Sequence, residues 1–330
     1  MANTIELSIS ATIKVIFNKD SQELEINSVE DLLNLDGLAI INHLEKLVIK
    51  NCYCLNDISI LKNFNNLRYL EIDNCPNIKD LSSINNLEKL KRLKCIGFPD
   101  LNILSSLKEN IKVKKLDLLQ DEKWFTGFLF NDDIQLYIYF KAEKVSEIKP
   151  ITNLQNCKEI GFYYCSQLNS IEGIEVLKEM QEIGFFNCNQ LKNISNLSKM
   201  LKLNRVSFEY CNSITDIDNL LSNIDFHELE VSNCENIKEL RFPENSTIET
   251  LKLHSNSKLH KINKWSHLKK LKTLLIEDCN AIEDYEEIGK LSNLEELGLF
   301  YNEGEISLKT LTQLNQLKTI RIGSHNTKWE

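Results

Sequence analysis

A cysteine recurs every 23 residues along much of this 330-residue chain, and that spacing constrains the fold more than any other feature of the sequence. Cys52 and Cys75 are 23 residues apart, and the same interval separates neighbours in the run Cys165, Cys188, Cys211, Cys234. We call each such position the anchor of a repeat. A fixed period of this length is typical of a solenoid, in which each repeat buries its apolar face by stacking on its neighbours.

Apolar residues keep fixed distances from the anchor. They lie eight, five and three residues before it and three and six after it; around Cys75 they are Leu67, Leu70, Ile72, Ile78 and Leu81. The alternation before the anchor predicts a strand in every repeat, and therefore a parallel sheet. Continuing in steps of 21 to 23 residues gives about fourteen anchors: Val29, Cys52, Cys75, Phe98, Asp121, Ala142, Cys165, Cys188, Cys211, Cys234, Asn256, Cys279, Asn302 and His325. An anchor that points into the core explains why cysteine and asparagine recur at this position. A thiol is small and readily buried, and an asparagine amide satisfies buried backbone groups.

Three segments resemble the leucine-rich repeat signature L-x-x-L-x-L-x-x-N/C: LEKLVIKNC at 44–52, LRYLEIDNC at 67–75 and LEELGLFYN at 294–302. The short repeat is similar to those of bacterial internalins and of plant disease-resistance receptors. The resemblance implies an α/β fold: a curved right-handed solenoid with a parallel β-sheet on the concave face and short helical, 3-10 or irregular segments on the convex side. It also implies protein binding, and it brings no catalytic motif.

The pattern predicts two parts, a cap over residues 1–20 and a repeat domain over residues 21–330. In the cap, Ile5, Leu7 and Ile9 alternate with polar residues, as do Ile13, Val15 and Phe17, which predicts a β-hairpin over the first repeat. The repeat becomes irregular over 121–142, where the aromatic-rich insert 122–133 follows the Asp121 anchor. This irregularity is either a local repacking or a binding feature. Trp329 is a candidate cover for the last repeat.

The composition argues against some classes of binding partner. The net charge is −9, which argues against nucleic acid and anionic membranes because both require a basic footprint. No run of 18 apolar residues occurs, and the first residues lack the basic and solidly apolar regions of a signal peptide. We therefore expect a cytoplasmic protein with reduced cysteines, although export as an effector into a host cell is also compatible.

The sequence offers no set of residues for catalysis or for metal or cofactor binding. Phosphate-binding and nucleophile-elbow motifs are absent. The repeat register places His254 on the concave side and His260 and His267 elsewhere, and Cys52 and Cys54 lack zinc-type spacing. Cys54 is the one cysteine outside an anchor or core position, and it has no visible catalytic partner. We expect no catalytic residue, no metal and no cofactor, and hence not an enzyme.

Residues two, four and six positions before each anchor should face solvent on the concave side. Several are apolar in the middle of the chain, and contiguous exposed apolar patches mark interaction sites. Gly161 and Gly184, which have no side chains, should leave unoccupied space on the sheet surface beside this patch. The predicted partner-binding residues are the apolar Leu119, Leu136, Ile138, Phe140, Tyr163 and Phe186, with Glu159, Glu182, Arg205 and Glu209 as polar surroundings. The alternative is that the 122–133 insert folds across these residues and buries them.

A second, smaller candidate lies near the end of the chain, where Phe300 and Tyr301 stand beside Gly298, with Glu277 and Asp278 nearby. The tyrosines directly before anchors, Tyr164, Tyr210 and Tyr301, should lie where the strands end and could extend either surface.

The sequence thus predicts a non-catalytic module that binds a partner protein on its concave face. The alternatives are an adaptor that recruits an enzyme, or recognition of a peptide or small ligand at the central aromatic patch. We expect a monomer, with self-association through the apolar patch as the other possibility.

If the cysteines are structural thiols, a mild reductant should leave the melting temperature unchanged. Thermal unfolding with and without reductant checks this. A fall of many degrees would instead indicate stabilising disulfides and contradict a reducing compartment.

Overall fold

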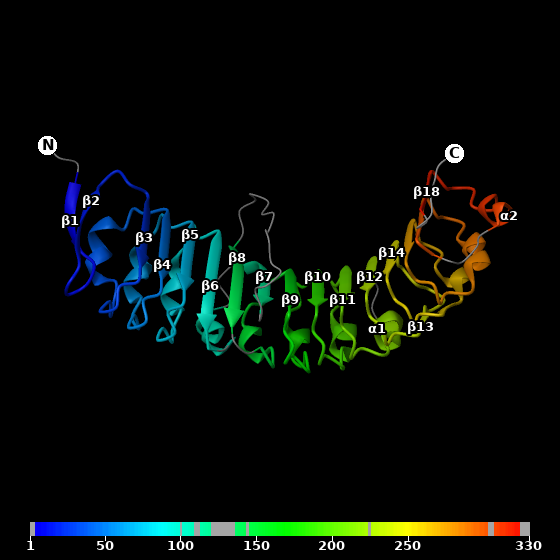
Figure 1. The fold of residues 1–330 in the computed structure, drawn as a ribbon, viewed down its shortest axis with the longest axis horizontal. Coiled ribbons are helices and arrows are strands. Elements are labelled where there is room, and N and C mark those ends of the chain that lie inside the picture. The colour runs from blue at the N-terminus through cyan, green and yellow to red at the C-terminus, as the bar shows by residue number, and fades with distance from the viewer. Residues whose placement is uncertain are drawn as a thin grey trace. The chain divides into compact units, whose positions relative to one another are not determined.

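The computed structural model describes residues 4–99, 101–108, 113–119, 136–142, 145–223, 226–302 and 307–323, with the backbone alone at 113–119, 136–142, 223 and 308. The chain divides into two compact units, residues 1–163 and 164–330, and each is described by itself. Figure 1 shows in each unit a row of neighbouring strands with short helical turns along one side.

The sheet of the first unit is parallel. In spatial order its strands are β3 (Glu23–Asn27), β4 (Lys46–Lys50), β5 (Tyr69–Asp73), β6 (Arg92–Phe98), β8 (Leu136–Ala142), β7 (Val113–Leu119) and β9 (Glu159–Tyr163).

The second unit has the same design with an unbroken strand order. Its parallel strands are β10 (Glu182–Phe186), β11 (Arg205–Glu209), β12 (Glu228–Ser232), β14 (Thr250–His254), β16 (Thr273–Glu277), β17 (Glu296–Phe300) and β18 (Thr319–Gly323). On the other side, β13 (Glu239–Arg241) pairs with β15 (Lys261–Asn263). The predicted α/β leucine-rich repeat solenoid is confirmed.

Short helical turns lie between many of the described strands and return the chain from one strand to the next. They are the 3-10 helices η1 (Asp36–Ile41), η2 (Ser59–Asn63), η3 (Ser82–Asn86), η4 (Leu101–Ser106), η5 (Lys149–Ile151), η6 (Ile174–Val176), η7 (Ser195–Lys199), η8 (Trp265–His267) and η9 (Tyr285–Lys290), with α1 (Asp218–Asn223) and α2 (Leu308–Leu311). An Asp or Asn side chain five residues after the anchor often starts the turn; Asp57 Oδ1, for example, accepts the Ser59 amide at 2.7 Å. Because side chains three apart share one face of a 3-10 helix, Leu61 and Phe64 are both fully buried.

The core follows the predicted offsets. All seven cysteine anchors are fully buried, and so are Leu67, Leu70 and Ile72 before Cys75. The helical turns add core positions nine and twelve residues after the anchor, as at Leu61 and Phe64. The offsets considered in the sequence missed these two positions.

The anchors satisfy buried backbone groups, as predicted. Cys234 Sγ donates to the Ser232 carbonyl at 3.3 Å, so a cysteine caps its own strand. Asn256 reaches further: its Oδ1 accepts the Cys234 amide at 3.0 Å and its Nδ2 donates to the Val231 carbonyl at 2.7 Å. An asparagine anchor thereby ties two repeats together.

The irregular region departs from the predicted order of repeats. Strand β8 lies between β6 and β7, so the strands are not arranged in chain order there. Ala142, predicted as the anchor that follows Asp121, pairs with the anchor Phe98. Strand β8 has one residue fewer than β6 before that pair, so Ile138 pairs with Leu93 and Phe140 with Cys95. Leu93 and Cys95 are buried.

The assignment of Leu136, Ile138 and Phe140 to solvent-facing register positions is therefore wrong. Ile138 and Phe140 take the register of core residues, and Leu136 shares their alternation on the same strand. Four further features of the sequence analysis, Asp121, the insert 122–133, His325 and Trp329, lie outside the described residues.

The first residues form the antiparallel hairpin of β1 (Thr4–Ser8) and β2 (Lys14–Asn18). Leu7, Ile9 and Phe17 are buried. Gly37 in η1 lies directly against this hairpin, since a Cβ there would stand 1.8 Å from the Ser8 carbonyl oxygen. Within the described ranges, no helix is long and apolar enough to cross a bilayer.

The Asn256→Ala variant should lose about 2–4 kcal/mol of unfolding free energy, because it leaves the buried Cys234 amide and Val231 carbonyl without their partner. Chemical denaturation measures this loss.

Asn256→Cys is the matched variant. It should lose less than Asn256→Ala, because cysteine fills the same position in the repeats of Cys234 and Cys279. Equal losses for the two variants would contradict the bridging role of the amide.

Candidate functional site

The residue directly before the anchor has a left-handed backbone in repeat after repeat. Its φ lies between +49° and +71° at Ser28, Asn51, Asn74, Gly97, Tyr164, Asn187, Tyr210, Asn233, Ser255, Asp278 and Tyr301. Glycine and asparagine tolerate this conformation, whereas a bulky residue there costs roughly 1–2 kcal/mol. Tyr164 and Tyr210 therefore occupy a position at which asparagine, the residue at 187 and 233 in the neighbouring repeats, would be free of strain.

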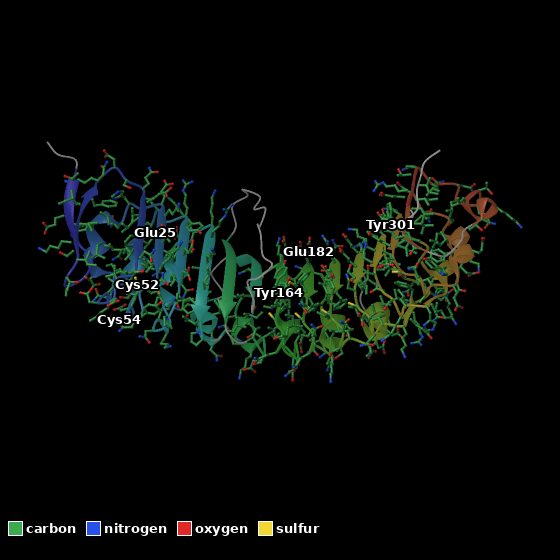
Figure 2. The ribbon with its side chains drawn as sticks, viewed as in Figure 1. Glu25, Cys52, Cys54, Tyr164, Glu182 and Tyr301 are labelled. Carbon is green, nitrogen blue, oxygen red and sulfur yellow. The ribbon has the colours of Figure 1, made fainter. Side chains whose placement is uncertain are left out.

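Two of these tyrosines enclose a phenylalanine in the second unit. The Phe186 ring centroid lies 5.0 Å from that of Tyr164 and 5.9 Å from that of Tyr210, both in edge-to-face geometry. We call Tyr164, Phe186 and Tyr210 the aromatic cluster. Tyr210 is 43% exposed and the other two are half-buried. Figure 2 labels Tyr164 together with Glu182, the first residue of β10.

Most carboxylates near the aromatic cluster are matched by cations. Arg205 lies 3.6 Å from Glu228 and 3.3 Å from Glu230, and Lys252 lies 2.6 Å from Glu228. The next acid along the sheet, Glu277, lies 3.2 Å from His254 Nδ1. Arg205, Lys252 and His254 are therefore each already paired with a carboxylate.

Glu209 is the exception. It pairs in register with Phe186 on one side and Ser232 on the other. Its carboxylate has no hydrogen-bond or ion-pair partner among the described residues. Burial, followed by the nearby charge of Glu230, raises the pKa of Glu209, with only a small opposing effect of His254.

The two units differ in charge balance on the open face of the sheet. On the strands of the first unit whose side chains are described, β3 to β6 and β9, five carboxylates (Glu23, Glu25, Glu71, Asp73, Glu159) meet four cations (Lys46, Lys50, Arg92, Lys94). On β10 to β18 of the second unit, six carboxylates (Glu182, Glu209, Glu228, Glu230, Glu277, Glu296) meet three cations (Arg205, Lys252, Arg321). The larger acidic excess thus lies on the unit that carries the aromatic cluster.

The remaining predicted site residues divide between the units. Phe186, Glu182, Arg205 and Glu209 are half-buried on β10 and β11 of the second unit. In the first unit, Tyr163 and Glu159 are half-buried on β9, and the backbone of Leu119 pairs with that of Tyr163.

The unoccupied space predicted beside Gly184 is partly filled. A Cβ at Gly184 would lie 2.8 Å from the Ser207 hydroxyl oxygen, so this side chain fills part of the space.

The contribution of Tyr164 and Tyr210 was only partly foreseen. Their place at the strand ends was predicted, but their packing against Phe186 and their left-handed backbone were not. The signal is present in the sequence, because most other residues directly before anchors are Asn, Ser, Gly or Asp, the types that favour this conformation.

In the second candidate surface an aromatic ring lies close to two glycines. A Cβ at Gly298 would lie 2.9 Å from Phe300 Cε2, and one at Gly323 would lie 3.1 Å from Phe300 Cδ1. The Phe300 ring therefore packs beside these two glycines, and Leu275 Cδ2, which would lie 2.5 Å from a Cβ at Gly298, leaves still less room there. Tyr301 remains 39% exposed.

The cysteines are not arranged for nucleophilic chemistry. Nine of the ten are buried thiols. Burial raises the pKa of Cys234 to about 12 and that of Cys279 to about 11, which keeps both protonated. A hydrogen bond with Cys75 lowers the pKa of Cys52 to about 7, but Cys52 is fully covered. Cys54 is exposed (Figure 2). No group of three or more His, Cys, Asp or Glu residues within the described ranges could hold a metal ion.

Comparisons with known proteins give a family and a fold. The sequence matches the profile of the BspA type leucine rich repeat region over residues 132–250 and 232–329, together more than half of the chain. Comparison with curated protein sequences gives no match.

The solved structures similar to this chain include the following two. An internalin from Listeria monocytogenes is 18% identical, with a TM-score of 0.47, covering 94% of this chain and 90% of that one. The Toll–Spätzle complex of Drosophila contains a chain 16% identical, with a TM-score of 0.53, covering 91% of this chain and 42% of that one. At these identities the likeness concerns the fold alone.

The Tyr210→Asn variant should change the unfolding free energy by less than about 1 kcal/mol, because relief of the left-handed backbone offsets the lost contact with Phe186. Chemical denaturation against wild type measures this difference.

Tyr210→Val is the control, since it loses the ring contact and keeps a side chain that disfavours the left-handed region. It should lose about 2 kcal/mol. If Tyr210→Asn lost as much as Tyr210→Val, backbone strain at this position would be refuted.

Proposed function

The chain belongs to the BspA-type leucine-rich repeat family, and we propose that it is a non-catalytic module that binds a partner protein on the open face of its parallel sheet. The observation that carries this proposal is the aromatic cluster. An exposed sheet face is normally lined by polar residues, whereas here three aromatic rings from successive repeats pack together at the ends of the strands.

The composition of the surface favours a protein partner. Energetically dominant interface residues are enriched in tyrosine and arginine and are surrounded by polar groups. The aromatic cluster supplies two tyrosines, and Arg205, Glu182 and Glu209 lie on the adjacent strands. Phe186 lies on a regular parallel strand and the two tyrosines directly follow such strands, so little ordering entropy is lost on binding.

Backbone strain gives independent support. Residues held in disfavoured backbone regions cluster at binding sites, because binding rather than folding selects them. Asparagine at 164 and 210 would relieve the strain, yet both positions carry tyrosine. The Drosophila Toll chain, which shares this fold, was solved in a complex with Spätzle, and this supports protein binding as a use of this fold.

In the first unit, Tyr163, Glu159 and Leu119 belong to the proposal as a surface of the same kind. Their backbones hold the solvent-facing register on β9 and β7. Leu136, Ile138 and Phe140 are left out because of their register with core residues.

The test compares wild type with the Tyr164→Asn, Tyr210→Asn double variant. A partner isolated with the wild-type protein is purified, and its dissociation constant for each protein is measured by calorimetry. Loss of two central aromatic side chains should weaken binding by about thirtyfold or more, equivalent to about 2 kcal/mol.

A Leu201→Asn variant serves as the control, because Leu201 is 93% exposed in a loop outside the sheet. It should bind as wild type does. Equal affinity of wild type and the double variant, with both proteins folded, would move the binding surface away from the aromatic cluster.

A further inference from the structure

We infer that Glu209 and the aromatic cluster form a subsite for a basic side chain, lysine or arginine, presented by an extended segment of a partner protein. The inference rests on the proposed function and adds the chemistry of the group that the surface recognises. It follows from the position of Glu209, the charge balance of its surroundings and a comparison with a second carboxylate in the same protein.

The position of Glu209 places a negative charge beside aromatic rings. Glu209 pairs in register with Phe186, and Tyr210 is its neighbour in the chain. Phe186 in turn contacts Tyr164 and Tyr210 edge to face. A cation above such rings is attracted to their faces, and a carboxylate within reach adds a charge-assisted hydrogen bond. The two features favour the same kind of ligand.

The surroundings leave the charge of Glu209 unbalanced. Arg205, the cation on the same strand, is engaged by Glu228 and Glu230. Lys252 is engaged by Glu228 and His254 by Glu277. Within the part of the chain that the structure describes, no cation contacts Glu209.

Glu71 shows what a compensated carboxylate looks like in this fold. It lies on the open face of β5 and is 7% exposed. Tyr69 donates a hydrogen bond to it at 2.6 Å, and Lys94 and Lys50 lie at 3.4 and 3.6 Å. Burial acts to raise the pKa of Glu71, but these partners together lower it.

Glu209 is a partly buried carboxylate without any of these partners, and its pKa is raised, first by burial and then by Glu230. A half-buried charge without a partner is unfavourable for folding alone, since water solvates it only partly. An incoming ammonium or guanidinium group would provide what Tyr69, Lys50 and Lys94 provide for Glu71. The occupant that fits this site is therefore a cationic side chain.

The shape of the surface favours an extended segment over an isolated small cation. The aromatic cluster spans three successive repeats, and Glu209 lies on the third. A segment that places an apolar side chain on the rings and a basic one at Glu209 would use both features. The acidic excess of the second unit adds attraction for such a segment.

The test is selection of random peptides displayed on phage against the full-length protein. Wild type should enrich peptides with lysine or arginine at one position next to an apolar or aromatic residue. Selection on Glu209→Gln should lose the basic position and keep the apolar one. Glu296→Gln is the matched control, because Glu296 lies on the same face but pairs with Arg321 at 2.7 Å, and it should enrich the same peptides as wild type.

A synthetic peptide from the wild-type selection is then measured by calorimetry in two forms, with the basic residue and with a neutral residue of similar length, citrulline or norleucine. The neutral form should bind wild type about tenfold more weakly. On Glu209→Gln the two forms should bind alike. A tenfold difference that persists on Glu209→Gln would assign the basic residue to another acid and overturn the inference.

The failures of the two proposals can be distinguished. Peptides that require Tyr164 and Tyr210 but contain no preferred basic residue would overturn the subsite and leave protein binding in place. Peptides that bind the Tyr164→Asn, Tyr210→Asn variant as well as wild type, or no enrichment at all on wild type, would count against both.

Discussion

Every feature of this protein depends on the in-register stacking of parallel strands. A single repeat has one apolar face and cannot bury it alone, so its stability comes from the repeats on either side. The register is held in two ways: backbone pairing joins residues a whole repeat apart, and buried anchors satisfy the groups where each strand ends. Asn256 shows the second most clearly, since one amide bonds to both Cys234 and Val231 of the preceding repeat.

The stacking explains how side chains with no sequence proximity become a surface. Tyr164, Phe186 and Tyr210 are about a repeat apart in the chain and adjacent in space. The solenoid fixes their backbones, so their side chains can vary without changing the path of the chain. The face of the sheet can therefore carry strain at Tyr210, and at Glu209 a charge without a partner among the described residues, while the core beneath remains regular.

The sequence predicted the parts of the fold that repeat and missed the parts that depend on geometry between segments. The burial of Cys75 and its flanking leucines follows from periodicity, and the amide bridge of Asn256 follows from residue chemistry. The placement of β8 between β6 and β7 could not be predicted, because periodicity gives the spacing of strands along the chain and not their order in space. The error at Ile138 and Phe140 has the same origin: one missing residue before Ala142 inverts the alternation for the whole strand. For the candidate site, Phe186 and Glu209 were identified from their offsets. That Glu209 has no partner among the described residues could not be predicted, because it depends on Arg205 and Lys252 pairing with other carboxylates.

The order of β6, β8 and β7 also has a consequence for how the first unit reaches its folded state. In a regular solenoid each strand adds to the edge left by the one before, so folding can proceed along the chain through local contacts. Here the edge of β6 belongs to β8, yet β7 is synthesised first. Until residues 136–142 arrive, β7 can pair with β6 in an arrangement that must later open to admit β8. The β6–β8–β7 segment therefore introduces a non-local step, with a competing misordered state, into a protein whose second unit can assemble in chain order.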